Sequence, residues 1–235
     1  MILGDTCTRS CSFCRVNKKF TGKLGLEKEE PFKVAQKVKD LKLRYVVITS
    51  VTRDDLDDGG SGVFAETIGL IRNLNHGVII EILIPDFRSK LSSLNTVLDS
   101  GPNVVGHNLE TVKRLYPRVR PQAGYKASLG LLALIKKAKP KIITKSSIML
   151  GMGESRQELV QAMKDLHAAG CDILTLGQYL APSREHYPVK KYVTPQEFES
   201  LKEEARLIGF RSILSGPLVR SSYQAQKLYD QFICA

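Results

Sequence analysis

The stretch Arg44-Tyr45-Val46-Val47-Ile48-Thr49 is the starting point for predicting the fold of this 235-residue chain. A short run of β-branched and other apolar residues is typical of a strand that is buried on both faces. Working outward from it, we expect further strands at residues 1–4, 77–84, 103–107, 141–150, 172–177 and 210–214. Stretches with helical periodicity separate these runs. Alternation of strands and helices along a chain predicts a parallel α/β sheet.

The intervening helices are expected at residues 31–41, 63–74, 89–98, 109–115, 128–138, 154–169 and 194–208, with a charged loop over residues 18–30. Pro31 opens the first helix, and Thr194 caps the last one with Pro195 at its first position. About six strand–helix units are too few for a closed eight-stranded barrel. Chemistry in folds of this kind sits in the loops that follow the carboxyl ends of the strands, so those loops are the candidate site.

Composition limits the class of protein. Apolar residues make up 43% of the chain and charged residues 25%, which is ordinary for a globular protein, and residues 1–235 are expected to form a single domain. No run of 18 apolar residues predicts a membrane span, and Asp5 and Arg9 interrupt any signal peptide. The net charge of +11 fits either nucleic acid or an acidic protein partner, and no nucleic-acid-binding motif accompanies it.

Three of the five cysteines, Cys7, Cys11 and Cys14, lie within eight residues. Their C-x3-C-x2-C spacing lets three thiolates converge on a compact metal centre. Three thiolates do not complete a tetrahedral zinc site, whereas an iron–sulfur cubane held by three cysteines keeps one iron open. Zinc and unrelated thiols remain alternatives. The odd number and close spacing argue against disulfides, which points to a reducing compartment. Cys171 and Cys234 are expected to be a buried residue and a tail thiol.

Polar residues follow the expected strands, where a ligand would bind. Asn108 and Glu110 could bond ribose hydroxyls, although the same pattern fits a helix start. Lys145 lies in a strand pattern, where an unpaired ammonium is costly to bury, so a role near a carboxylate is favoured. The other polar positions after strands are Thr49, Ser50, Arg53, Arg88, Gln178, Tyr179, Arg220, Ser221 and Ser222. Helix caps and turns are the alternative interpretation for each cluster.

The cysteine loop, with Phe13 before its last cysteine, resembles the signature loop of the radical S-adenosylmethionine superfamily. Longer strings resemble the lipoyl synthase family, and this resemblance runs nearly from end to end. These strings are Tyr45-Val46-Val47-Ile48-Thr49-Ser50-Val51, Arg53-Asp54-Asp55-Leu56, His107-Asn108-Leu109-Glu110, Lys145-Ser146-Ser147-Ile148-Met149-Leu150-Gly151, Thr175-Leu176-Gly177-Gln178-Tyr179-Leu180, Pro182-Ser183 and Gly216-Pro217-Leu218-Val219-Arg220-Ser221-Ser222-Tyr223.

The resemblance implies a partial (β/α)6 barrel with parallel strands, a 4Fe–4S cluster and S-adenosylmethionine. It also implies a sulfurtransferase that inserts sulfur at carbons 6 and 8 of an octanoyl chain on a lysine of a lipoyl carrier domain. The implied partners are the acyltransferase subunits of 2-oxoacid dehydrogenases, the glycine cleavage H protein, and an electron donor such as ferredoxin or flavodoxin. The carriers are typically acidic, which favours a protein partner over nucleic acid or membrane for this basic chain. The expected compartment is the cytoplasm in a bacterium, or the mitochondrion or plastid in a eukaryote.

The resemblance also assigns roles to residues. Cys7, Cys11 and Cys14 would hold the cluster, and Ser222, in the C-terminal segment 211–235, would bind an auxiliary 4Fe–4S cluster that supplies the sulfur. S-adenosylmethionine would contact Phe13, Thr49, Ser50, Asn108, Glu110, Lys145 and Gln178. The residues that shape the substrate site would be Arg53, Arg88, Tyr179, Arg220 and Ser221.

Two features depart from this family's pattern. Its three auxiliary-cluster cysteines precede the signature loop, whereas this sequence begins at Met1, and Gly106 stands where the family usually has Asn. The expectation is a lipoyl synthase with its N-terminal segment missing from the sequence. The alternatives are a radical enzyme with a different substrate or sulfur source, and a non-catalytic protein that binds lipoyl carriers.

Overall fold

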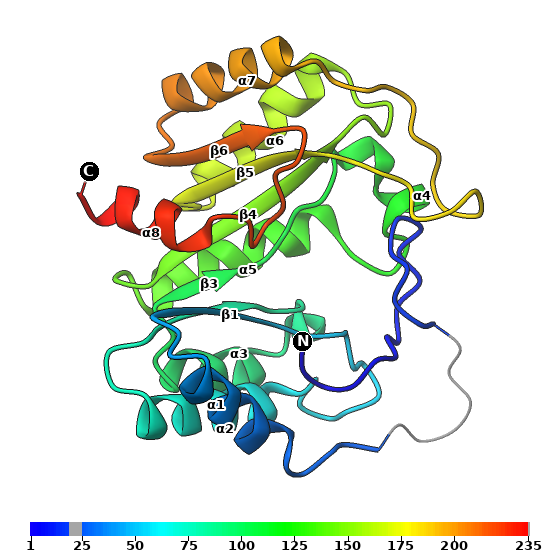
Figure 1. The fold of residues 1–235 in the computed structure, drawn as a ribbon. Coiled ribbons are helices and arrows are strands. Elements are labelled where there is room, and N and C mark those ends of the chain that lie inside the picture. The colour runs from blue at the N-terminus through cyan, green and yellow to red at the C-terminus, as the bar shows by residue number, and fades with distance from the viewer. Residues whose placement is uncertain (19–24, 235) are drawn as a thin grey trace. The chain divides into compact units, whose positions relative to one another are not determined.

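Six strands form one parallel sheet in the order β1-β2-β3-β4-β5-β6 (Figure 1). The structure is a computed structural model that describes residues 1–18 and 25–234. The strands are β1 (Tyr45–Thr49), β2 (Ile79–Leu83), β3 (Val104–Gly106), β4 (Ile143–Leu150), β5 (Ile173–Gln178) and β6 (Ser212–Gly216). The sheet is not closed, so the expected α/β partial (β/α)6 barrel with parallel strands is confirmed. None of the described helices is long and apolar enough to cross a membrane.

The chain divides into two compact units. The first unit comprises Met1–Ser10 and Val16–Gly106, and the second comprises Cys11–Arg15 and His107–Ala235. Cys7 therefore belongs to the first unit, and Cys11 and Cys14 belong to the second.

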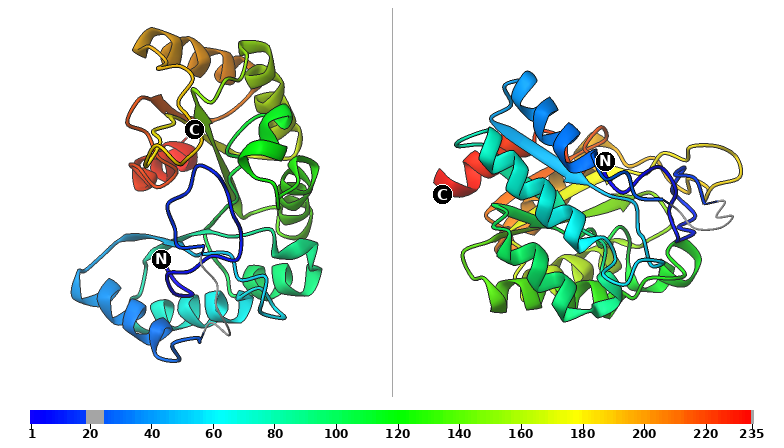
Figure 2. Two further views of the ribbon diagram at one scale, coloured as in Figure 1. Left: turned by 90° about the vertical axis from the view of Figure 1, so that its right-hand side faces the viewer. Right: turned by 90° about the horizontal axis from the view of Figure 1, so that it is seen from below.

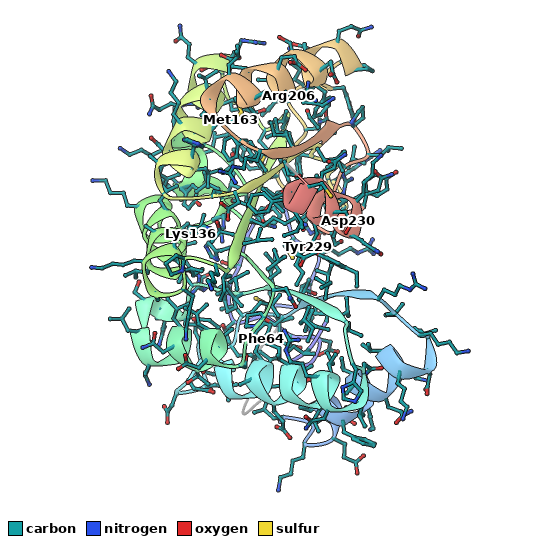
Figure 3. The ribbon with its side chains drawn as sticks, turned by 90° about the vertical axis from the view of Figure 1, so that its left-hand side faces the viewer. Phe64, Lys136, Met163, Arg206, Tyr229 and Asp230 are labelled. Atoms are coloured by element: carbon teal, nitrogen blue, oxygen red, sulfur yellow. The ribbon has the colours of Figure 1, made fainter. Side chains whose placement is uncertain are left out.

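In the first unit, β1 and β2 pair in register, with Ile48 opposite Ile82. The unit's helices are α1 (Glu30–Asp40), α2 (Ser61–Leu74) and α3 (Leu91–Asp99), with a 3-10 turn at Phe87–Ser89. Phe64 of α2, labelled in Figure 3, is fully buried and meets the Phe87 ring edge-on at 6.4 Å between ring centroids. This apolar layer fixes the ends of β1 and β2, where the candidate loops begin.

In the second unit, all six residues of β5 are buried, as expected for a strand covered on both faces. The α-helices are α4 (Tyr116–Val119), α5 (Tyr125–Ala138), α6 (Arg156–Ala168), α7 (Pro195–Ile208) and α8 (Ala225–Cys234), and a 3-10 turn spans Lys113–Leu115. Figure 2 shows α8 on the face of β4–β6 opposite the face that α5 and α6 cover. Lys136 of α5, labelled in Figure 3, forms an ion pair of 2.5 Å with Asp172, directly before β5.

The expected helix start at Thr194 is confirmed. The Thr194 hydroxyl accepts a hydrogen bond from the Glu197 N–H at 3.2 Å, and the Glu197 carboxylate accepts one from the Thr194 N–H at 3.0 Å. Pro195 occupies the first helical position. This reciprocal pair satisfies two N–H groups that a helix start leaves without partners.

Four expectations about elements differ from the structure. Residues 1–4 contribute one parallel bridge, between Ile2 and Ser50, in place of a strand. Residues 109–115 hold a 3-10 turn, because Glu110 has φ of 67° and pairs with Ile148 beside β4. Gln178 is the last residue of β5, not part of the loop after it, and α8 was not expected. Residues 19–24 of the loop expected at 18–30 lie outside the described residues.

Candidate active site

The Cys7 side of the signature loop is held by the loop after β1. The Thr8 N–H and hydroxyl both donate to the Thr52 carbonyl at 3.0 Å, and the Thr8 hydroxyl accepts from the Asp54 N–H at 3.0 Å. The Cys7 N–H donates to the Asn17 carbonyl at 2.8 Å. The backbone on both sides of Cys7 is therefore fixed by hydrogen bonds to Asn17, Thr52 and Asp54.

Arg9 anchors the same loop to two strand ends. Its guanidinium is 7% exposed and donates to Asp54 at 2.8 and 3.0 Å and to Asp86 at 2.7 and 2.5 Å. Burial disfavours the charged form, but the carboxylates of Asp86 and Asp54 outweigh that effect and raise the pKa of Arg9. This role of Arg9 was not predicted from the sequence, although an arginine between two cysteines and an aspartate after each of two strands were visible signals.

The sequence-predicted residues of the first unit lie at the end of β1 and in the loops after β1 and β2. Arg53 is 1% exposed and binds Asp55 through two hydrogen bonds of 2.8 Å, which lower the pKa of that carboxyl. Thr49 ends β1, and the buried Ser50 hydroxyl lacks a hydrogen-bond partner among the described residues. Arg88, in contrast, is 72% exposed and lies 3.8 Å from Asp54. Ser50 thus has hydrogen-bonding capacity left for a ligand, and Arg53 holds its own loop.

The Cys11 side of the loop is held within the second unit. The Ser12 N–H donates to the Val119 carbonyl and the Ser12 hydroxyl to the Arg118 carbonyl, both at 3.0 Å. The Ser12 carbonyl accepts from the Tyr187 N–H at 2.9 Å. Cys11, Phe13 and Cys14 are each half-buried. The loop backbone is fixed while the side chains that would meet a cluster keep access to it.

Asn108 and Glu110 are brought together beside β4. The Asn108 amide donates to the Glu110 carboxylate at 3.0 Å. Burial raises the pKa of Glu110, and Arg120 and Asn108 oppose that shift. His107 is buried and its Nε2 lies 3.0 Å from the Ser128 hydroxyl, which gives it a packing role. A carboxylate and an amide at one turn can bind the two hydroxyls of a ribose.

Lys145, Gln178 and Tyr179 are all buried. The Gln178 amide nitrogen contacts the carbonyls of Leu150, Tyr179 and Lys191 at 3.0 Å, and its oxygen accepts from the Val193 N–H at 2.8 Å. The Tyr179 hydroxyl donates to the Tyr187 carbonyl at 2.6 Å. These bonds hold the loop after β5, so Gln178 and Tyr179 shape the loop. Contact of Gln178 or Lys145 with a cofactor stays a prediction.

The Arg220-Ser221-Ser222 segment lies after β6 and over β5. A β-carbon at Gly177 would approach the Val219 carbonyl oxygen to 2.1 Å, so glycine is required where this segment crosses the strand. The Arg220 guanidinium donates to the Val219 carbonyl at 2.7 Å. Ser222 is exposed and Ser221 is half-buried, which leaves Ser222 accessible to a ligand.

The donor set fits an iron–sulfur cluster with a bound small molecule. Cys7, Cys11 and Cys14 form no disulfide, whereas Cys171 is buried with its pKa raised, and Cys234 is exposed at the tail, as expected. Within residues 1–18 and 25–234, no group of three or more His, Cys, Asp or Glu side chains is already arranged to hold a metal ion. Partly accessible thiols are the ligands such a cluster requires, and the Ser50 hydroxyl and the Arg120 Nε are buried without partners among the described residues.

Solved structures share this fold. A methylornithine synthase matches with a TM-score of 0.70 and 16% identity, over 91% of this chain and 62% of that protein. An FeFe-hydrogenase maturase matches with a TM-score of 0.69 and 14% identity, over 97% of this chain and 52% of that protein. At such low identity these likenesses show the fold alone.

Sequence comparisons identify the family. The Radical SAM superfamily matches residues 1–166. A lipoyl synthase of Alkaliphilus metalliredigens is 50% identical over 232 residues, which cover 98% of this chain and 79% of the relative. One from Symbiobacterium thermophilum is 54% identical over 233 residues, which cover 99% of this chain and 72% of the relative. The chain therefore belongs to the lipoyl synthase family of radical S-adenosylmethionine enzymes.

Proposed function

We propose that Cys7, Cys11 and Cys14 hold a 4Fe–4S cluster and that this protein binds S-adenosylmethionine. When bound, these groups supply a radical that removes hydrogen from carbons 6 and 8 of a protein-bound octanoyl chain, where sulfur is then inserted. The observation that carries this proposal is the signature loop, which is anchored through Arg9 on one side and Ser12 on the other. Its backbone is held by hydrogen bonds, and its three thiols are half-buried and therefore accessible to a cluster.

The chain's own residues have distinct parts in this proposal. Asn108 and Glu110 bind the ribose hydroxyls, because they form an amide–carboxylate pair at one turn. The Ser50 hydroxyl donates to the cofactor, because its hydrogen-bonding capacity is unused among described residues. Phe13 covers the adenine, and Thr49, Lys145 and Gln178 line the same cofactor. Arg53, Arg88, Tyr179, Arg220 and Ser221 shape the substrate site.

Anaerobic reconstitution with iron counting tests the cluster assignment. We expect about four iron per chain, as a three-cysteine cubane requires, and 5′-deoxyadenosine after addition of S-adenosylmethionine and a reductant. Cys11→Ser is expected to lose both the iron and the product. Cys234→Ser is the matched control, because Cys234 is exposed at the tail, and it should retain both. Equal iron binding by both variants would contradict the assignment.

We further propose that Ser222 binds an auxiliary cluster that supplies the sulfur when a segment carrying the family's three further cysteines is supplied. The exposure of Ser222 supports this role, because a ligand to a second cluster must be reachable. Iron content per chain is compared between Ser222→Ala and the neighbouring Ser221→Ala. With that segment supplied, the unsubstituted protein should bind about eight iron per chain, Ser222→Ala should fall toward about four, and Ser221→Ala should stay near eight. A Ser222→Ala protein with unchanged iron content would show that Ser222 is not a ligand.

The proposed partners are the octanoylated carrier domains of 2-oxoacid dehydrogenases and of the glycine cleavage system, with ferredoxin or flavodoxin as electron donor. The net charge of +11 supports acidic protein partners. Chemical cross-linking to an octanoylated carrier domain, with a charge-reversed carrier as control, tests this interaction. Equal cross-linking of both carriers would contradict it.

A further inference from the structure

Arg120 lies at the end of α4 and joins several groups of the second unit. Its Nη1 donates to the Asn108 carbonyl at 2.9 Å, the Leu109 carbonyl at 3.2 Å and the Tyr116 hydroxyl at 3.0 Å. The guanidinium also lies over the Tyr116 ring, 5.4 Å from its centroid. The Tyr116 hydroxyl in turn donates to the Leu109 carbonyl at 2.8 Å. Arg120 and Tyr116 thus hold the backbone of the 108–110 turn from the same side.

The residues directly before Arg120 hold the signature loop. Ser12 donates to the carbonyls of Val119 and Arg118, so the neighbours of Cys11 and of Arg120 are hydrogen-bonded to each other. The end of α4 therefore contacts two parts of the proposed site: the 11–14 arm with two cluster thiols, and the 108–110 turn with the proposed ribose ligands.

The Arg120 guanidinium is a positive charge that is largely shielded from solvent. Its Nε is buried and has no hydrogen-bond partner among the described residues. Burial opposes the charge, but Tyr116, Glu110 and Cys11 raise the pKa of Arg120, so it stays cationic. A buried N–H without a partner is uncommon, and a fixed cation acts strongly where water is excluded.

We propose that Arg120 is a positioning residue that couples the 108–110 turn to the 11–14 arm and raises the reduction potential of the bound cluster. Reduction adds a negative charge to the cluster, and a cation held nearby stabilises that state. The hydrogen bonds to Asn108 and Leu109 set the geometry for S-adenosylmethionine. The inference rests on the proposed binding of cluster and cofactor at these residues.

Four variants separate the charge of Arg120 from its hydrogen bonds. Arg120→Met removes both, Arg120→Lys keeps the charge, and Tyr116→Phe keeps the charge and removes the hydroxyl that supports the turn. Arg118→Met is the matched control, because the Arg118 side chain is exposed and its carbonyl bond to Ser12 would survive. The measurements are the cluster potential by redox titration and the dissociation constant of S-adenosylmethionine, both normalised to iron content.

At a fixed solution potential, we expect the ratio of reduced to oxidised cluster to fall about tenfold in Arg120→Met. This corresponds to a reduction potential lower by about 59 mV for a one-electron couple. Arg120→Lys and Tyr116→Phe should keep the wild-type potential and bind S-adenosylmethionine several-fold more weakly. Arg118→Met should change neither quantity. A role limited to folding would lower iron content without moving either normalised value.

The proposal is overturned if Arg120→Met keeps the wild-type potential, or if Tyr116→Phe and Arg120→Lys both bind S-adenosylmethionine as tightly as wild type. Should Arg120→Met fail to fold, the other two variants still decide the hydrogen-bonding part and Arg120→Gln, a polar neutral replacement, decides the charge. Failure of the proposed function would be a different result, since wild type itself would then bind neither cluster nor cofactor.

Discussion

At the scale of single residues, Arg9 shows how one side chain holds a reactive loop. Its planar guanidinium satisfies two carboxylates, one after each of two strands, through four hydrogen bonds. A buried charge of this kind is stable only while its partners are present. Removing Arg9 takes the same cation away from Asp54, which is half-buried, and from Asp86, which is buried.

We predict that Arg9→Met lowers the free energy of unfolding by about 3 kcal/mol, because it removes the guanidinium that binds the buried Asp86 and the half-buried Asp54. Arg9→Lys should cost less but still lower stability, because a lysine cannot bind both carboxylates in the same bidentate way. Urea denaturation measures the change. Arg15→Met, an exposed residue of the same loop, is the control. If Arg9→Met and Arg15→Met are equally stable, the ion triad does not anchor the loop.

At the scale of secondary-structure elements, Gly177 in β5 decides where the Ser222 segment can lie. A β-carbon there would lie 2.1 Å from the Val219 carbonyl oxygen, whereas at Gly216 in β6 the nearest atom would be a Val219 methyl at 3.5 Å. Gly177 is the last but one residue of β5 and lies opposite Gly216, the last residue of β6, so the two glycines form a matched pair.

We predict that Gly177→Ala lowers the free energy of unfolding by about 2 kcal/mol and displaces the 217–222 segment, because a backbone carbonyl cannot yield as a flexible side chain can. Gly216→Ala should leave both nearly unchanged. Thermal unfolding measures the first effect, and limited proteolysis of the segment measures the second. Identical behaviour of the two variants would refute this account of the glycine.

The glutamates at the helix starts of α6 and α7 should make the stability of the protein sensitive to acid. Arg114 and the Ser155 N–H lower the pKa of Glu158 to about 2, and Lys191 and the Thr194 N–H lower that of Glu197 to about 2. Because both folded-state values lie below the ordinary value of 4.5, their contribution to stability is complete above pH 4.5 and is lost as the pH falls toward 2.

We therefore expect wild type to lose unfolding free energy between pH 5 and about pH 2.5, and the double variant Glu158→Gln, Glu197→Gln to lose less of it over that range. Urea denaturation at a series of pH values measures the slope. Glu185→Gln, in the loop after β5, serves as control. Parallel slopes for the double variant and wild type would argue against the caps as acid-sensitive groups.

At the scale of the whole molecule, the charge balance governs association. Thirty-five lysines and arginines against 24 acidic residues give the net charge of +11. We predict that the dissociation constant for an acidic octanoylated carrier domain rises several-fold as salt increases from low ionic strength to about 0.3 M, because screening shortens the reach of surface charges. Calorimetric titration over this range is the measurement. A dissociation constant that does not change with salt would exclude charge as the basis of recognition.

Much of the fold could be predicted because the signals are local. The apolar run around Val46 and the Thr194-Pro195 start carry their structures in neighbouring residues. The structure of the Leu109–Leu115 region could not be predicted in this way. The positive φ of Glu110 follows from its bridge to Ile148, which is 38 residues later in the sequence. Helix α8 was overlooked although Ala225 and Leu228 lie on one buried face.

Residues of the candidate site could be predicted where their type and local spacing indicate a function. They could not be predicted where their role depends on partners that are distant in the sequence. Three cysteines at close spacing indicate a cluster by themselves. The pairing of Arg9 could not be predicted from neighbouring residues, because its partners are 45 and 77 residues away. Gln178 was predicted in the loop after β5 but ends the strand, and its four backbone contacts depend on how that loop folds back, which no local pattern encodes.

The anchoring of the signature loop by Arg9 and Thr8 also bears on damage and repair. Oxygen destroys exposed iron–sulfur clusters, and a loop that depended on iron for its conformation would lose that conformation whenever the cluster was lost. Here the hydrogen bonds around Cys7 and Arg9 use only protein atoms. We expect a chain stripped of iron by air to remain folded, to escape proteolysis, and to be reloaded without new synthesis.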